Sequence, residues 1–165
     1  MFKIKKILAP TDLSELSEAG VRYALEIARW LGAEVIVYHV IHPQEIDAYY
    51  NAFHRFSSTE EFDPARRLTE ERYQAIAEFL TENFAAMISE IKIHQSVEVG
   101  LPHRSIVEKA KKEGADMIVM STHGRTGVVH MLLGSVTEKV TRRAPCPVLS
   151  VRPPKEAKLA QAATA

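Results

Sequence analysis

The sequence predicts an α/β protein, a single doubly wound domain with a five-stranded parallel sheet and helices on both faces. Apolar runs of strand length alternate along the chain with segments in which apolar residues recur at helical spacing. This alternation is typical of a parallel sheet with right-handed crossovers. Two of the runs, Glu34–Ile41 and Ala115–Met120, lack a polar alternation, as expected of strands buried on both faces.

Composition limits the classes of partner. The chain has 165 residues, of which 46% are hydrophobic and 25% charged, as in an average globular domain. Lysine and arginine number 21, as do aspartate and glutamate, so net charge favours neither nucleic acid nor an anionic membrane. No apolar stretch reaches the roughly 18 residues that span a bilayer, and the N-terminus resembles a strand more than a signal peptide. With a single cysteine, Cys146, the chain is expected to be cytoplasmic.

The first strand is expected to contain Ile4, Ile7, Leu8 and Ala9 and to end at Pro10–Asp12. An amphipathic helix follows, for which Asp12 or Ser14 supplies the N-cap and Gly32 the end. The second strand is Glu34–Ile41. These elements open the alternating pattern.

Residues 42–66 depart from that pattern. They are polar, contain Pro43 and Pro64 and show no sustained period. We expect a partly ordered excursion with a short helical turn, which either packs on the domain as a loop or forms a lid or partner surface. Its aromatic residues are Tyr49, Tyr50, Phe53, Phe56 and Phe62.

The second half of the chain returns to regular structure. A helix is expected over Leu68–Ile88, and the alternating strand Ile91–Val99 is placed nearer a sheet edge. Pro102 opens the next helix and Gly114 closes it. The last strand is Val148–Val151, and residues 153–165 form a flexible, alanine-rich tail.

A glycine-containing loop joins the strand that ends near Met120 to a helix that runs from near Ser135 to Arg143. Ser135-Val136-Thr137-Glu138 fits a capping box. The amide groups at this helix start, with Gly134 beside them and a hydroxyl from Ser135 or Thr137, suit a phosphate chain. Glycines and capping boxes also serve turns that bind nothing, and the local features support both uses equally.

The position of this loop favours a ligand. In a doubly wound sheet, ligands bind at the carboxyl ends of strands where the strand order reverses. The loops at Pro10–Asp12, Val40-Ile41 and Ser121 are expected to meet there. Neither the P-loop pattern nor G-x-G-x-x-G after the first strand is present, which disfavours a P-loop or a Rossmann dinucleotide site.

Nearly the whole chain resembles the universal stress protein family. The segments that carry the resemblance are KKILAPTD, VIVYHVI, VEVGLP, ADMIVMSTHGRTG and LLGSVTEKVTRRAPCPVLSVR. The nucleotide-binding branch of that family has glycine, two residues, glycine, nine residues, then glycine and serine or threonine. Here the register is Ser121, Gly124 and Gly134-Ser135, so serine replaces the first glycine. Its Cβ would lie beside the phosphates and its hydroxyl can bond to an oxygen, so we expect altered affinity and not loss.

The resemblance implies an adenine nucleotide alpha hydrolase-like fold over residues 1–152 and ATP as ligand, with ADP or AMP as alternatives and Mg²⁺ carried by the nucleotide. Asp12 would accept a ribose hydroxyl, a use that competes with capping the first helix. The Val40 backbone would read the adenine edge, and Arg125 would add charge near the phosphates. The implied contacts are Pro10, Thr11, Asp12, Val40, Met120, Ser121, Thr122, His123, Gly124, Arg125, Thr126, Gly127, Gly134, Ser135, Val136 and Thr137.

No catalytic base and no metal site emerge from the remaining residues. His123 is expected to order its own loop more than to transfer protons. His39 and His42 lack the carboxylate or cysteine partners of a metal site. Cys146 is expected to be a small buried residue.

The preferred hypothesis is therefore an ATP-binding stress-response or signalling module. The resemblance suggests a homodimer formed through Val148–Val151, where an exposed edge strand gives a reason to pair. Two alternatives stay open: a nucleotide-independent dimeric interaction protein, and a weak ATPase that hydrolyses ATP slowly.

Overall fold

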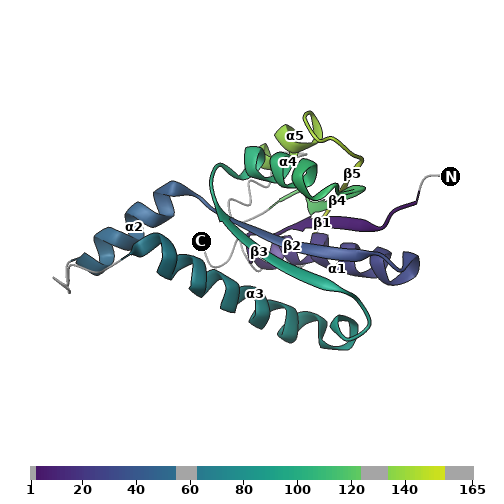
Figure 1. Ribbon diagram of the computed structural model, residues 1–165, viewed down its shortest axis with the longest axis horizontal. Helices are drawn as coiled ribbons and strands as arrows, with labels where there is room; N and C mark the ends of the chain where they lie inside the picture. The colour runs from purple at the N-terminus through teal and green to yellow at the C-terminus, as the bar shows by residue number, and fades with distance from the viewer. Residues whose placement is uncertain (1–2, 55–62, 124–133, 155–165) are drawn as a thin grey trace.

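The computed structural model of the chain describes residues 3–54, 63–123 and 134–154. Five parallel strands form one sheet in the order β3-β2-β1-β4-β5, with helices on both faces (Figure 1). The predicted fold class is thus confirmed. The strands are β1 (Lys6–Pro10), β2 (Glu34–Ile41), β3 (Ile93–Val99), β4 (Met117–Ser121) and β5 (Val148–Val151). The helices are α1 (Glu15–Leu31), α2 (Pro43–His54), α3 (Pro64–Ile88), α4 (Pro102–Glu113) and α5 (Ser135–Thr141).

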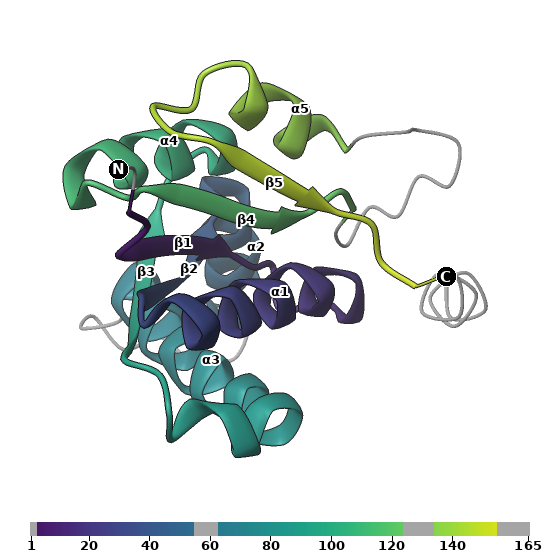
Figure 2. The same ribbon diagram turned by 90° about the vertical axis from the view of Figure 1, so that its right-hand side faces the viewer.

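The sheet separates two apolar layers. Alternate residues of β1 point to opposite faces, so that Ile7 and Ala9 belong to one core and Leu8 to the other. Figures 1 and 2 show α1 and α3 on the first face and α4 and α5 on the second. The strands β1, β2 and β4 are almost wholly buried, whereas in β3, at the predicted sheet edge, Val97 alone is buried.

The predicted helix ends are mostly confirmed. Ser14 is the N-cap of α1, where its hydroxyl accepts a hydrogen bond from the Ser17 amide. Gly32 and Gly114 end α1 and α4 in the left-handed conformation that glycine adopts without strain. Pro102 begins α4, where a missing N–H costs nothing.

The excursion after β2 is more ordered than predicted. Its first part is α2, a helix of 12 residues. Pro43 lies at the first helical position, where proline is favoured, and does not break the helix. Tyr49 and Phe53 stack on one another, and the Arg67 guanidinium of α3 lies 4.8 Å from the Phe53 ring centre. Phe56 and Phe62 lie outside the described residues.

The predicted capping box on α5 is wrong. Gly134, not Ser135, occupies the N-cap position, and no side chain caps the helix. Two bonds to the end of β4 set this start: Gly134 N–H donates to the Thr122 carbonyl, and the Thr137 hydroxyl donates to the Ser121 carbonyl. Glu138 pairs with Arg142 at 2.9 Å and does not reach back to the helix start.

The close packing of α1 on β4 depends on Gly20. A Cβ added to Gly20 would lie 2.5 Å from the Ser121 amide nitrogen and 2.9 Å from the Met120 carbonyl carbon. Because both are backbone atoms, they cannot turn away as a flexible side chain can. This contact sets how near the first turns of α1 lie to the carboxyl end of β4.

No described helix is both long and apolar enough to cross a membrane. The strand β5 ends the sheet on the side opposite β3. Residues 155–165 of the predicted tail lie outside the described part of the chain.

We predict that Gly20→Ala lowers the free energy of unfolding by about 1–3 kcal/mol, because the added methyl overpacks the contact with β4. Helix propensity alone would favour alanine by about 1 kcal/mol. Urea denaturation followed by circular dichroism measures the change. Gly100→Ala is the matched control, since its added Cβ meets only the Ser105 side chain. A stabilised Gly20→Ala protein would contradict the close packing.

Candidate functional site

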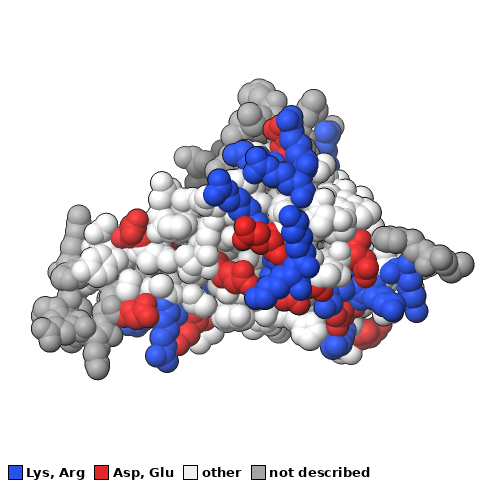
Figure 3. All heavy atoms as spheres, turned by 45° about the horizontal axis from the view of Figure 1, so that its top comes forward, with Lys and Arg blue, Asp and Glu red and all other residues white. Residues whose placement is uncertain are grey.

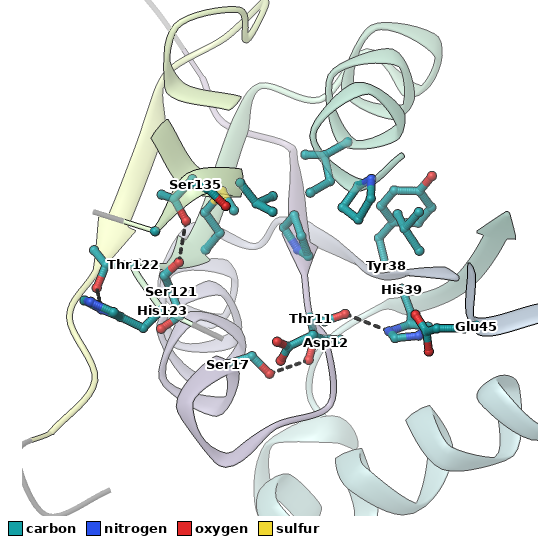
Figure 4. A pocket seen from close by; sticks show the side chains of 18 residues that line it. Thr11, Asp12, Ser17, Tyr38, His39, Glu45, Ser121, Thr122, His123 and Ser135 are labelled. Carbon is teal, nitrogen blue, oxygen red and sulfur yellow. Dashed lines mark hydrogen bonds between the residues drawn. The ribbon is translucent and has the colours of Figure 1, made fainter. Parts of the chain in front are cut away.

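A cleft of about 240 Å³ opens at the carboxyl ends of β1, β2 and β4. Here the chain order reverses, because β1 has β2 on one side and β4 on the other. Every predicted site residue that the structure describes lines this cleft (Figure 4). These residues are Pro10, Thr11, Asp12, Val40, Met120, Ser121, Thr122, His123, Gly134, Ser135, Val136 and Thr137. The other predicted residues, Gly124, Arg125, Thr126 and Gly127, lie outside the described part of the chain.

The loop after β1 forms one wall and holds Asp12 in a defined position. Asp12 Oδ1 accepts hydrogen bonds from the Ser14 amide at 3.1 Å and from the Ser14 hydroxyl at 2.6 Å. The residue between them, Leu13, has a φ of +62° and is the only described non-glycine residue with a positive φ. Such backbone is strained for leucine, and packing of its side chain against the core offsets the cost.

Thr11 is bonded at each of its polar groups. Its amide donates to the Tyr38 carbonyl, and its hydroxyl lies 2.8 Å from the Ser17 hydroxyl and accepts from the Leu13 amide. Its carbonyl oxygen lies 2.9 Å from His39 Nδ1. The loop that presents Asp12 is therefore fixed to both β2 and α1.

The Ser121 side chain is directed toward α1. Its hydroxyl donates to the Leu16 carbonyl at 2.6 Å, and the residue is buried. The expected bond from this hydroxyl to a ligand oxygen is thus replaced by a bond within the protein. The small separation between α1 and β4 at Gly20 brings the two groups together.

Gly134 is required by the protein's own packing. An added Cβ would lie 2.6 Å from the Thr122 carbonyl oxygen. This close approach explains the glycine without any ligand, so the glycine alone is no sign of a phosphate. The first amides of a helix have no acceptor within it, and Ser135, Val136 and Thr137 at the start of α5 all line the cleft.

The remaining walls were not predicted from the sequence. Apolar side chains of Pro102 and Ile106 on α4 face the cleft together with Val40 and Met120. Tyr38 also lines it and donates its hydroxyl to Glu98 at 2.9 Å. Burial and the neighbouring Glu98 carboxylate raise the pKa of Tyr38, which keeps the phenol neutral. The further lining residues that the sequence analysis missed are Ser17, His39 and Glu45.

The alternation of side chains along β2 offered a signal for one of these residues. Tyr38 precedes Val40 by two positions and therefore shares its face of the sheet. Glu45 lines the cleft because α2 begins immediately after β2. Only a short helical turn was predicted within the excursion and it was not placed, so the contribution of Glu45 had no signal in the sequence.

A second hollow, of about 400 Å³, lies between β2, β3 and α4 and is lined by charged side chains. Lys109, 8% exposed, bonds to Glu98 at 2.9 Å and to Glu113 at 3.3 Å. Lys92, with Lys6 and His94, lowers the pKa of Glu34 to about 2. On the face that carries α4 and α5, positive side chains gather with negative ones among them (Figure 3). The charges in this hollow compensate one another, which makes it a poorer ligand site than the cleft.

Metal and acid–base chemistry find little support in the described residues. No group of three or more histidine, cysteine, aspartate or glutamate side chains among them is arranged to hold a metal ion. The His123 ring bonds through Nδ1 to the Thr122 hydroxyl at 2.8 Å. Asp116, at the amino end of β4, accepts from the Lys5 and Lys6 amides. The cleft can bind and orient a ligand, and its ionisable lining residues are Asp12, Tyr38, His39, Glu45 and His123.

Comparison with known proteins identifies relatives of this chain. A model of the universal stress protein family matches residues 3–152. The chain is 36% identical over 158 residues to universal stress protein MJ0577 of Methanocaldococcus jannaschii, covering 90% of this chain and 94% of that protein. It is 35% identical over 161 residues to MJ0531 of the same organism, with 92% and 84% covered.

Solved structures agree with the sequence relatives. The structure of MJ0577 superimposes with a TM-score of 0.68 at 33% identity, over 92% of this chain and 98% of that one. A universal stress protein in complex with cAMP gives a TM-score of 0.59 at 25% identity, over 92% and 99%. Sequence and fold lead to one assignment. The chain belongs to the universal stress protein family.

Proposed function

We propose that the cleft at the carboxyl ends of β1, β2 and β4 binds an adenine nucleotide, with ATP as the first candidate and ADP or AMP as alternatives. One observation carries the proposal: a carboxylate, an apolar wall and the first amides of α5 line a single cleft at the point where strand order reverses. A related protein of similar fold in complex with cAMP supports a nucleotide as the class of ligand.

Asp12 is proposed to accept a hydrogen bond from a ribose hydroxyl. Its bonds from Ser14 fix the carboxylate at the wall of the cleft, so little rotamer freedom is lost on binding. The two uses of Asp12 need not compete, because one carboxylate oxygen supports Ser14, the N-cap residue of α1, while Asp12 also lines the cleft.

The base is proposed to lie against the apolar wall. Val40, Met120 and Ile106 provide a surface on which a flat ring excludes water. Val40 lines the cleft, and its backbone is proposed to hydrogen-bond the adenine edge.

The phosphates are proposed to lie along the residues after β4 and at the start of α5. The amides of Ser135–Thr137 and the Ser135 hydroxyl supply donors there. The predicted phosphate contacts of residues 124–127 belong to the same proposal. Mg²⁺ would arrive with the nucleotide, since no described cluster of ligands holds it.

The protein is proposed to act as a cytoplasmic nucleotide-binding module in a stress response or in signalling. Any hydrolysis is proposed to be slow, because no described residue of the cleft is placed as a general base. Two copies are proposed to associate through β5, an edge strand whose Leu149 is 37% exposed. A nucleotide-independent interaction protein remains the alternative if no nucleotide binds.

Asp12→Ala is expected to weaken ATP and ADP by a similar factor of about ten, because one charge-assisted bond to the nucleoside is lost. Isothermal titration calorimetry with Mg²⁺ measures both affinities. Glu108→Ala removes an exposed carboxylate of α4 and serves as the control. A loss confined to ATP would place Asp12 at the phosphates, and no loss would remove it from the site.

Ser121→Gly, which restores the family's glycine, is expected to lower the free energy of unfolding by about 0.5–1.5 kcal/mol, because a hydrogen bond to the Leu16 carbonyl is lost. ATP affinity should change by less than about threefold, since the hydroxyl is directed away from the ligand. Ser96→Gly on β3 controls for glycine in a strand. Weaker ATP binding at unchanged stability would show instead that the hydroxyl contacts the nucleotide.

Dimerisation through β5 predicts a specific effect of proline at Ser150. The Ile118 amide donates to the Pro147 carbonyl and the Thr122 amide to the Val151 carbonyl, so the backbone of Val148 and Ser150 faces the open edge. Ser150→Pro should therefore yield a monomer with the sheet intact, whereas Ser150→Ala should stay dimeric. Sedimentation velocity distinguishes them. If the parent protein is monomeric at every concentration from about 1 to 100 μM, the proposed dimer is refuted.

A further inference from the structure

The hydrogen-bond ladder between β1 and β2 stops one bond early. The register ends at Pro10 opposite Tyr38, and the Thr11 amide adds a bond of 2.9 Å to the Tyr38 carbonyl. In a parallel pair the next bond would run from the Val40 amide to the Thr11 carbonyl. Among the described residues, no such backbone bond joins Val40 to Thr11.

A side chain replaces that backbone donor. His39 Nδ1 lies 2.9 Å from the Thr11 carbonyl oxygen, as the dashed line in Figure 4 shows. A carbonyl only accepts hydrogen bonds, so Nδ1 carries the proton. His39 is 2% exposed and lies on the face of β2 that packs toward α1 and α3. The bond thus draws the Thr11 carbonyl out of the line of the sheet, toward that face.

The direction of the Val40 N–H and C=O follows from the geometry of β2. In a strand the N–H and C=O of one residue point to the same neighbour, and alternate residues point to opposite neighbours. Tyr38 bonds to β1, so Val40 also directs its N–H and C=O to that side, beyond the end of β1. Val40 lines the cleft there.

The backbone N–H and C=O of Val40 have the hydrogen-bonding pattern that recognises adenine. A backbone N–H and C=O together suit the ring-nitrogen acceptor and the amino donor of adenine, whereas guanine presents an oxygen acceptor and a ring N–H in the opposite arrangement. If the Thr11 carbonyl accepted the Val40 amide, the edge would lose its donor.

We propose that His39 is a positioning residue for base recognition. By holding the Thr11 carbonyl, His39 ends the β1–β2 ladder early and leaves the Val40 edge to the base. The inference rests on the proposed function, namely that an adenine nucleotide occupies the cleft.

Substitutions that keep or remove the Nδ1 donor test the proposal. His39→Leu removes the donor, and His39→Asn retains one, because the asparagine amide nitrogen is attached to Cγ as Nδ1 is. We expect His39→Leu to lower ATP affinity about tenfold and to reduce the preference for ATP over GTP. Affinity for inorganic triphosphate, which has no base, should change less than about twofold, and His39→Asn should recover most of the ATP affinity.

Amide hydrogen exchange at Val40 provides a second readout that does not need a ligand. In the parent protein the Val40 amide should exchange faster than the neighbouring ladder amides of β2. In His39→Leu it should become protected, because the Thr11 carbonyl returns to the ladder. A ring nitrogen shift measured by ¹⁵N NMR should show the proton on Nδ1 in the parent protein.

The outcomes separate this inference from the proposed function. If the parent protein binds no nucleotide, the proposed function fails, while Val40 exchange in His39→Leu still decides whether His39 ends the ladder. If ATP binds but His39→Leu keeps both the affinity and the preference over GTP, the inference is overturned. Should His39→Leu not fold, His39→Gln replaces it: its amide is one bond farther out, and ATP binding about tenfold weaker than in His39→Asn is expected. Equal binding by these two variants would also overturn the inference.

Discussion

The Thr11 peptide is the constraint on which the cleft depends. Thr11 follows the last residue of β1. Its amide donates to the β2 backbone, its carbonyl accepts from the His39 ring, and its hydroxyl bonds to the Ser17 hydroxyl of α1. These bonds fix the path of the next residues, including the strained Leu13. The same few residues therefore close a strand, begin α1 and present Asp12, and none of these three tasks can change without the others.

The opposite wall of the cleft shows that the protein's own packing explains much of its glycine pattern. Gly134 lies against the Thr122 carbonyl and Gly20 against the backbone of β4. Serine at position 121 is accommodated because its hydroxyl bonds to the Leu16 carbonyl beneath α1. A departure from the family's glycine is thus compatible with the cleft, and the case for a nucleotide depends on the combined lining and not on any single glycine.

The sequence was sufficient for the fold because the fold follows from local patterns, whereas the site residues were taken from the family resemblance and remain a prediction. Each of these patterns can be recognised within a short stretch of sequence: a continuous apolar strand, a capped helix, or a glycine at a helix end such as Gly32 or Gly114. Where the prediction failed, tertiary contacts decide. The helix α2 is stabilised by its contacts with α3, where the Arg67 guanidinium lies over the Phe53 ring and the Tyr49 hydroxyl donates to Glu71. The start of α5 is set by its bonds to the end of β4, and His39 reaches the site only through the register of β1 and β2.

The most direct measurement of the central claim is a map of backbone amide shifts on addition of ATP and Mg²⁺ to the ¹⁵N-labelled protein. The account predicts shift changes confined to the cleft, largest at Asp12, Val40 and the amides that begin α5. The amides around the second hollow, which contains Lys109, should not shift. Shifts centred on that hollow or on α2 and α3, or no shifts at millimolar ATP, would contradict it. In that case the cleft would be a feature of the fold and not the site of its function.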